Sequence, residues 1–435
     1  MKIVKNSWSY ALYILLWFPV TTLFQDLVSP INKLLFAIVV FFMAVSVFDG
    51  ELLKNRKDLL IVVAAALVYL KALTYGLPEN KNMLFYFPFF VFLTWFVLTR
   101  YEKISSLMVE KINYVLLVSL AWTVPVVISI FLPSSYYKPE TWQVVYFYSY
   151  TSSSFRLAPS ALFIMVLVLW ITIIKGQKRY LLLDIVPLYC MFMGASRTYT
   201  VLGIIVFIIN WYFGFKNKKW FYISCLPVAC LLVYVLSLSA GMYKLSGSIS
   251  TVGTLSGLLN RLTSGRNVFW SDMLNAYWNE DILAKLFGGG LNFTVNVSGI
   301  WAHNDFIEIL CAHGVIGVLV YGYFMYRLLH VFLLPEGFKK RKMPVFLLGA
   351  IILVWLFNAC FNMYYTYFCA MVSYPIMLIG IHWYYYGGGR GLNIQADENC
   401  NQHNLDEERE QVYNQNDEKI VPMQPEGGGT PLTTN

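Results

Sequence analysis

The feature that most constrains this chain is the repeated occurrence of apolar stretches long enough to cross a lipid bilayer. A helix needs roughly 20 mostly apolar residues to span a hydrocarbon core about 30 Å thick, and such stretches recur from Trp8 almost to Gly387. The composition agrees, because 58% of the residues are hydrophobic and only 13% are charged, which is too few to solvate a water-soluble protein. The sequence therefore predicts an all-α, polytopic integral membrane protein.

About twelve transmembrane helices are predicted. Their windows are residues 9–25, 34–48, 59–78, 83–99, 112–132, 158–174, 180–195, 198–214, 220–238, 314–333, 343–361 and 366–387. The first window has no small-residue cleavage site after it, and we interpret it as a retained anchor. The resulting organisation is 1–238 (nine helices), 239–313 (one domain-sized extracytoplasmic loop), 314–387 (three helices) and 388–435 (a hydrophilic tail, expected to be disordered).

Basic clusters fix the expected orientation, because short loops rich in Lys and Arg stay in the cytoplasm. With a cytoplasmic N-terminus, every strong cluster falls inside: Lys54, Arg56, Lys57; Arg100, Lys103, Lys111; Lys175, Lys178, Arg179; Lys216, Lys218, Lys219; and Lys339, Lys340, Arg341, Lys342. The formal net charge of +8 is thereby explained by topology, and no nucleic-acid partner is expected. Both termini should be cytoplasmic, in a cell inner membrane.

Metal and cofactor signatures are weak in this sequence. Seven cysteines occur without any C-x-x-C spacing, which argues against a disulfide framework or a zinc site. The loop 239–313 contains no D-x-D-like acidic pair, which disfavours a nucleotide-sugar enzyme with a coordinated divalent ion. We therefore expect neither a metal nor a cofactor.

The large loop carries the first candidate, Arg266. From this residue onward, apolar side chains recur at helical spacing while polar ones occupy other faces, which predicts an amphipathic helix that can lie along the membrane surface. The apolar set is Phe269, Trp270, Met273, Leu274 and Tyr277. A guanidinium at the start of such a helix can reach a lipid phosphate, and the alternative is an arginine that only contacts ordinary headgroups.

A glycine turn and a histidine follow in the same loop. Gly288, Gly289 and Gly290 predict a compact turn that bends or approaches a ligand closely, although no Lys-Ser/Thr pair follows to make a phosphate loop. His303 precedes Asn304 and a D-x-x-E sequence that we interpret as the capping box of the next helix, Asp305 to Glu308. The partial positive charge of that helix start would keep the imidazole neutral, so that it can accept a proton. A histidine in this place is also common as a plain hydrogen-bonding residue.

Three further ionisable residues belong to the outer half of the predicted topology. Arg197 follows Ser196 in a very short outer connection, and Arg156 lies in the outer connection 133–157. Because an arginine at the bilayer centre costs about 2.5 to 3.5 kcal/mol or more, Arg197 should lie at the outer edge or face a polar cavity. Lys71 interrupts the third span, where it either functions or snorkels to the interface.

Three short patches occur together on this outer side: Ser196-Arg197 opening a span; Ser264-Gly265-Arg266 followed by Trp270; and Gly288-x-Gly290, then His303-Asn304, ending in Gly314-x-x-Gly317. In this order, with a large loop before the tenth span, they resemble the bacterial O-antigen ligases and O-antigen or capsule polymerases, the Wzy-like membrane glycosyltransferases. The resemblance covers mainly residues 190–330. The segment Phe155 to Pro159 departs from the family's small, Asn-Pro-rich pattern.

The resemblance implies a GT-C-like fold and a metal-independent transfer of glycan from undecaprenyl diphosphate. It makes Arg197 and Arg266 ligands of the diphosphate, with Arg156 as a third candidate, and His303 the base that activates an acceptor hydroxyl. Supporting positions are Asn304, Gly288 and Gly290. The implied partners are an undecaprenyl-diphosphate-linked oligosaccharide and membrane lipid, and a chain-length regulator is a family expectation.

Four functions stay open at this point. The first is a polymerase of lipid-linked repeat units of O-antigen, capsule or exopolysaccharide, and its sister is a ligase that transfers finished glycan to lipid A core or protein. A polysaccharide flippase would also have about twelve spans, but it needs charges along a path through both leaflets and commonly shows inverted repeats with broken helices. A scaffolding membrane protein would use the arginines only to hold headgroups.

Overall fold

The computed structural model describes residues 2–47, 56–138, 145–151, 153–194, 196–237, 265–334 and 343–386. The first part of the loop, 239–264 with Ser264, and the tail 388–435 lie outside these residues, as do the basic positions Lys54 and 339–342. Residues Met1–His382 form one compact unit, which contains the whole of the candidate site.

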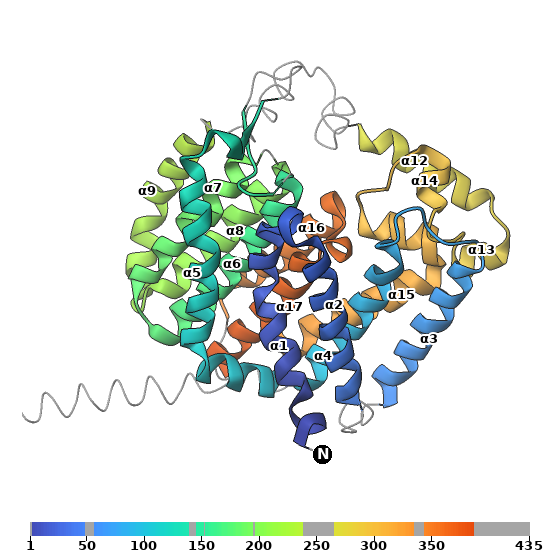
Figure 1. Cartoon of the computed structure of the whole chain (residues 1–435), viewed down its shortest axis with the longest axis horizontal. Helices are drawn as coiled ribbons and strands as arrows, with labels where there is room; N and C mark the ends of the chain where they lie inside the picture. The colour runs from blue at the N-terminus through green and yellow to red at the C-terminus, as the bar shows by residue number, and fades with distance from the viewer. Residues whose placement is uncertain are drawn as a thin grey trace, which may run out of the picture. The chain divides into compact units, whose positions relative to one another are not determined.

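The described chain is built almost entirely from helices (Figure 1). Up to the large loop they are α1 (Lys2–Leu23), α2 (Gln25–Val47), α3 (Arg56–Leu73), α4 (Met83–Glu110), α5 (Ile112–Ile130), η2 (Pro133–Ser135), α6 (Ser154–Lys175), η3 (Lys178–Asp184), α7 (Ile185–Met193), α8 (Arg197–Gly214) and α9 (Lys218–Ser237). After it come α12 (Arg266–Asn279), α13 (Ile282–Phe287), α14 (Phe293–Ser298), α15 (Asp305–Leu333), α16 (Val345–Asn362), η4 (Tyr364–Thr366) and α17 (Phe368–Tyr386).

Seven helices of the described chain are long and apolar enough to cross a membrane: α4, α5, α6, α8, α15, α16 and α17. Each coincides with a predicted window, so the all-α, multi-pass character expected from the sequence is confirmed by helix length and hydropathy. The remaining five windows fall on α1, α2, α3, the η3–α7 pair and α9. The full count of twelve spans stays a prediction.

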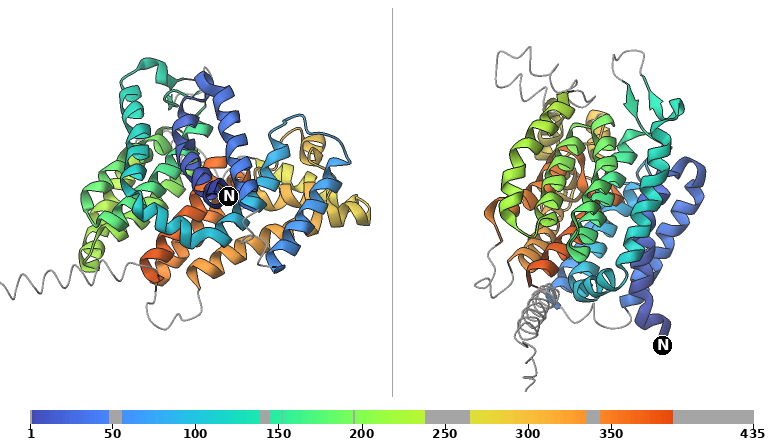
Figure 2. Two further views of the ribbon diagram at one scale, coloured as in Figure 1. Left: turned by 60° about the horizontal axis from the view of Figure 1, so that its bottom comes forward. Right: turned by 90° about the vertical axis from the view of Figure 1, so that its left-hand side faces the viewer.

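The loop elements gather at one end of the compact unit. Figure 1 and the right-hand view of Figure 2 show the N-terminus at one end and a small hairpin at the opposite end, and Figure 1 shows α12 and α14 toward the end that carries the hairpin. The hairpin pairs β1 (Tyr136–Tyr137) with β2 (Tyr146–Phe147) in antiparallel register. No sequence pattern indicated these strands, because two-residue strands are too short for an alternating pattern.

Helix α15 is the longest element and changes direction at Gly314, where φ is 69° and ψ is −171°. The same glycine lies against the end of α13, because a Cβ on it would overlap the backbone of Leu286. Gly288 makes the reciprocal approach to α15: its φ is 89°, and a Cβ there would overlap the Ala312 carbonyl. The amide of Gly289 donates to the carbonyl of Cys311 over 2.8 Å. The glycine turn therefore binds the backbone of α15 rather than leaving space for a ligand.

This packing predicts a large effect of a single methyl group at Gly288. Gly288→Ala combines a steric overlap with a left-handed backbone, so we expect a loss of about 3 kcal/mol of unfolding free energy. Gly322→Ala is the matched control on α15, since nothing lies within 4 Å of its added Cβ, and alanine should gain up to about 1 kcal/mol in a helix. Thermal unfolding of the two purified variants should show a lower melting temperature for Gly288→Ala and an equal or higher one for Gly322→Ala than for the unmodified protein. Equal melting temperatures of the two variants would contradict this packing.

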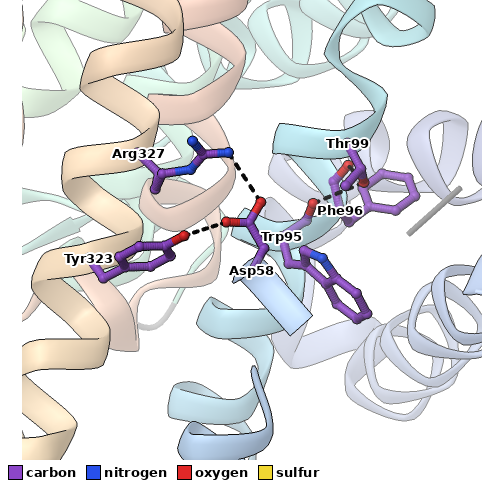
Figure 3. A network of polar contacts seen from close by, with 6 residues as sticks. All are labelled: Asp58, Trp95, Phe96, Thr99, Tyr323 and Arg327. Carbon is purple, nitrogen blue, oxygen red and sulfur yellow. Dashed lines mark hydrogen bonds and ion pairs between the residues drawn. The ribbon is translucent and has the colours of Figure 1, made fainter. Parts of the chain in front are cut away.

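The far half of α15 is tied to α3 by a buried carboxylate (Figure 3). Asp58, only 1% exposed, accepts a hydrogen bond from the Tyr323 hydroxyl over 2.6 Å and pairs with Arg327 over 3.2 Å. Both partners come from α15 and the acid from the first turn of α3. The two ends of α15 are thus anchored by different neighbours, the loop at one end and α3 at the other.

Candidate functional site

Three segments that are far apart in sequence meet at the C-terminal end of α16. The Arg266 guanidinium donates to the Phe361 carbonyl over 2.7 Å, and the Thr198 hydroxyl donates to the same oxygen over 3.4 Å. The Asn304 side chain donates to the Cys360 carbonyl over 3.2 Å. The last carbonyls of a helix lack intrahelical donors and carry partial negative charge. They therefore attract a guanidinium and orient it.

Helix α12 brings Arg266 beside the segment that carries His303. It begins directly after Gly265, whose φ of 79° suits glycine. Met273 and Tyr277 are completely buried on one face and Asp272 is exposed, as the amphipathic pattern predicted, but Phe269, assigned to the same apolar face, is 37% exposed. The indole of Trp270 donates to the Ala302 carbonyl over 2.6 Å. The first turn of α12 is thus fixed against the residue just before His303.

His303 lies immediately outside the start of α15, as predicted, but the capping box is wrong. Asn304 is the N-cap, and its side chain accepts the Ile307 amide over 3.2 Å. Asp305 instead accepts the Tyr321 hydroxyl, and Glu308 accepts the Thr294 hydroxyl and the Ala302 amide over 2.9 Å. Because Asn304 already caps the helix, Asp305 and Glu308 are not needed as capping residues, and both make tertiary contacts instead.

Backbone strain is concentrated at this place. Among the described residues, the non-glycine positions with positive φ are Ser149, His303 at 50° and Met363 at 62°. The last two flank the meeting point of α15 and α16. Such conformations cost of order 1–3 kcal/mol each and persist only where surrounding contacts enforce them, which is common at functional sites.

The imidazole of His303 is held in its neutral form. Burial, and secondly the charge of Arg266, lowers its pKa from the ordinary value of 6.5 to about 4. The direction is the one expected from the sequence, but the main causes are burial and a neighbouring guanidinium. At neutral pH the ring therefore has a lone pair that can accept a proton.

The arginines form one electrostatic group with two tyrosines. Burial lowers the pKa of Arg266, Tyr367 raises it and the charge of Arg197 lowers it, and the guanidinium still stays protonated. Arg156 interacts with Tyr86, which in turn interacts with Tyr367. The structure thus brings Arg266 within electrostatic range of both Arg197 and His303, whereas Arg156 interacts with Tyr86.

Some candidates lie elsewhere than the sequence suggested. Arg156 was expected in a loop, but α6 begins at Ser154 and places it in the first helical turn. Arg197 is the first residue of α8, as predicted for the span-opening motif. Lys71 lies in the last turn of α3, with its amine 4.4 Å from the centre of the Tyr75 ring. A lysine snorkelling near a helix end explains this position.

Sequence reasoning missed the other half of the site. The carbonyls of Cys360 and Phe361, the Thr198 hydroxyl and Tyr367 belong to it, and none was a candidate. One signal was present: asparagine and tyrosine recur from the end of α16 to the residue before α17, at Asn358, Asn362, Tyr364, Tyr365 and Tyr367.

Comparisons with known proteins add no relative. None of the protein-family models matches the chain, and no curated protein matches it. The fold and the site together define a class of protein. It is a multi-pass α-helical membrane protein in which two arginines, Arg197 and Arg266, lie near a neutral histidine, His303.

Proposed function

We propose that the chain polymerises lipid-linked surface polysaccharide of the O-antigen, capsule or exopolysaccharide type. In this reaction it transfers a glycan from undecaprenyl diphosphate to an acceptor sugar hydroxyl on the outer face of the inner membrane. The observation that carries the proposal is the convergence of Arg266, Thr198 and Asn304 on the carbonyls at the end of α16, beside neutral His303. These are the three motif segments whose order suggested the Wzy-like glycosyltransferases.

The chemistry fits the residues that are present. An imidazole nitrogen of His303 takes the proton of the acceptor hydroxyl, whose oxygen bonds to the anomeric carbon of the donor glycan. The bond from this carbon to the diphosphate oxygen breaks, and its electron pair leaves with undecaprenyl diphosphate. Arg266 and Arg197 then face the charge that develops on the leaving group. Fixed cations in a poorly hydrated site stabilise such charge without reorganisation.

The orientation of Arg266 favours this role over simple headgroup contact. Its bond to Phe361 uses one of the five N–H donors of a guanidinium and fixes the plane of the group. An arginine that only snorkels would extend into water instead. A prepositioned fork is suited to a diphosphate, because planar donors match its oxygens in pairs.

Reconstitution in nanodiscs tests the proposal and separates the alternatives. The donor is the lipid-linked oligosaccharide that accumulates in a deletion strain of the same organism. A polymerase produces lipid-linked glycans longer by whole repeats and releases undecaprenyl diphosphate, both detected by mass spectrometry. Transfer only when lipid A core or an acceptor protein is added indicates the ligase. In sealed proteoliposomes, movement of the donor from one leaflet to the other without any transfer indicates a flippase and rejects the proposal.

The neutral state of His303 predicts an unusual pH dependence of the reaction. A base with a pKa of about 4 is about 97% unprotonated at pH 5.5, whereas one with the ordinary value of about 6.5 is only about 9% unprotonated. We therefore expect kcat/KM, which reports the free enzyme, to be nearly constant from pH 5.5 to pH 8 and to fall toward pH 4. A tenfold decrease between pH 8 and pH 5.5 would contradict this environment of the histidine.

A further inference from the structure

Two tyrosines of α15 donate hydrogen bonds to buried aspartates over the same distance. The Tyr321 hydroxyl donates to Asp305 over 2.6 Å, and the Tyr323 hydroxyl donates to Asp58 over 2.6 Å. Both acids are buried, with exposed fractions of 0% and 1%. The pairs differ in location, because Asp305 is the first residue of α15 beside the candidate site, while Asp58 lies in the first turn of α3 (Figure 3).

The first pair continues into α16. The indole of Trp355 donates to the Tyr321 hydroxyl over 3.0 Å, so that this hydroxyl both accepts and donates. The Phe306 ring packs edge-on against the rings of Tyr321 and Trp355, at centroid distances of 5.9 and 6.2 Å. Trp355, Tyr321 and Asp305 thus form a continuous polar chain from the middle of α16 to the start of α15. We call this chain the α15–α16 network.

The network and Asn304 hold the same two helices at different heights. Trp355 precedes Cys360 by five residues, about 7.5 Å along the helix axis, and Asn304 contacts the carbonyl of Cys360 itself. Two attachments at separate heights fix both the tilt and the rotation of α16 against α15. The next carbonyl, that of Phe361, is the acceptor of Arg266. His303 lies two residues before Asp305.

We propose that the α15–α16 network is a positioning device for glycosyl transfer: by fixing the end of α16 against the start of α15, it sets the placement of Arg266 relative to His303. The inference rests on the proposed function, since the two placed groups are its leaving-group ligand and its base. Tyr321, Trp355 and Asp305 act through these groups and are positioning residues. Hydrogen bonds within a buried network restrict the motion of the groups that they join, and a displacement of about 1 Å can cost a hundredfold in rate.

The test compares Tyr321→Phe with Tyr323→Phe in nanodiscs, with the lipid-linked oligosaccharide from the deletion strain as donor. Each variant removes one α15 hydroxyl that donates to a buried carboxylate, and Tyr321→Phe also removes the acceptor of the Trp355 indole. We expect Tyr321→Phe to lower kcat about ten- to a hundredfold and Tyr323→Phe to change it less than about threefold, both measured at a temperature at which the two variants are folded. The melting temperature of Tyr321→Phe should be a few degrees lower than that of Tyr323→Phe, because it loses two hydrogen bonds instead of one.

A conservative variant distinguishes a positioning role of Asp305 from a general effect on folding. Asp305→Asn keeps an oxygen that accepts from Tyr321 and should retain most of kcat, whereas Asp305→Ala should match Tyr321→Phe. Equal kcat for Tyr321→Phe and Tyr323→Phe would overturn the inference, as would a failure of Asp305→Asn to exceed Asp305→Ala. If the unmodified protein transfers no glycan, the proposed function itself fails. If the unmodified protein transfers glycan and Arg266→Ala abolishes the transfer, the proposed function stands. The comparison of Tyr321→Phe with Tyr323→Phe then decides the positioning proposal alone.

Discussion

Cells that carry His303→Ala in place of the wild-type protein are expected to make no polymer ladder beyond single repeats. Loss of a positioned general base typically costs 10²–10⁴ in rate, which reduces elongation below what a cell needs. The helix cap is Asn304, so the variant retains it. We therefore expect normal amounts of the variant in the membrane, measured by immunoblot of the membrane fraction alongside the ladder.

The control for this variant is His330→Ala. His330 is the same residue type in the last turn of the same helix, at the opposite end from the site, where it packs against Tyr326. It should leave ladder length unchanged. A normal ladder with His303→Ala would remove the base from the proposed mechanism, and a loss of ladder with both variants would point to folding of α15 instead.

Arg266→Ala is expected to lower kcat/KM for the lipid-linked donor by at least about 10²–10³, the effect of removing one fixed donor from developing charge. Arg266→Lys should be impaired almost as strongly. A lysine keeps the positive charge, but a point charge cannot hold the Phe361 carbonyl and a diphosphate with one planar fork. The measurement is initial rate against donor concentration in nanodiscs, with Arg179→Ala as a control on an exposed arginine.

The form of the loss matters for Arg266. A ligand of the leaving group should affect kcat as well as KM, because the charge it stabilises is largest in the transition state. An effect on KM alone would reduce Arg266 to a ground-state anchor of the lipid headgroup. Full activity of Arg266→Lys would show that a positive charge is sufficient without the planar guanidinium. It would contradict the proposal that the bond to the Phe361 carbonyl orients this group for catalysis.

The positions of helices were predictable where apolar length alone decides them. The windows over α5, α6 and α8 were placed within a few residues, because hydrocarbon thickness fixes span length, whereas α4 continues eleven residues beyond its window of 83–99 to Glu110. The start of α12 at Arg266 was predictable from helical periodicity. The position of His303 outside α15 was predicted from the D-x-x-E sequence at Asp305, although the residue that caps the helix is Asn304. Boundaries set by tertiary contacts were not: α3 ends at Leu73, several residues before its apolar window does.

Half of the site was invisible in the sequence for a different reason. The chemistry of Arg266 and His303 can be read from their residue types. The carbonyl of Phe361 cannot be recognised in this way, because every residue has a backbone carbonyl. Likewise, Gly288 is equally compatible with a ligand or with a close helix, and only the overlap with Ala312 decides between them. The acids at 305 and 308 matched a local capping pattern, yet their partners come from tertiary packing, which short-range patterns cannot report.

Arg266 and Asn304 donate their hydrogen bonds to main-chain oxygens of Phe361 and Cys360. The side chains at these two positions can therefore change during evolution as long as α16 ends at the same place. Related chains would then keep the donors at 266 and 304 while varying at 360 and 361. An alignment column would show no constraint at the very residues that hold the arginine, so this part of the site has to be recognised by its shape instead of by sequence identity.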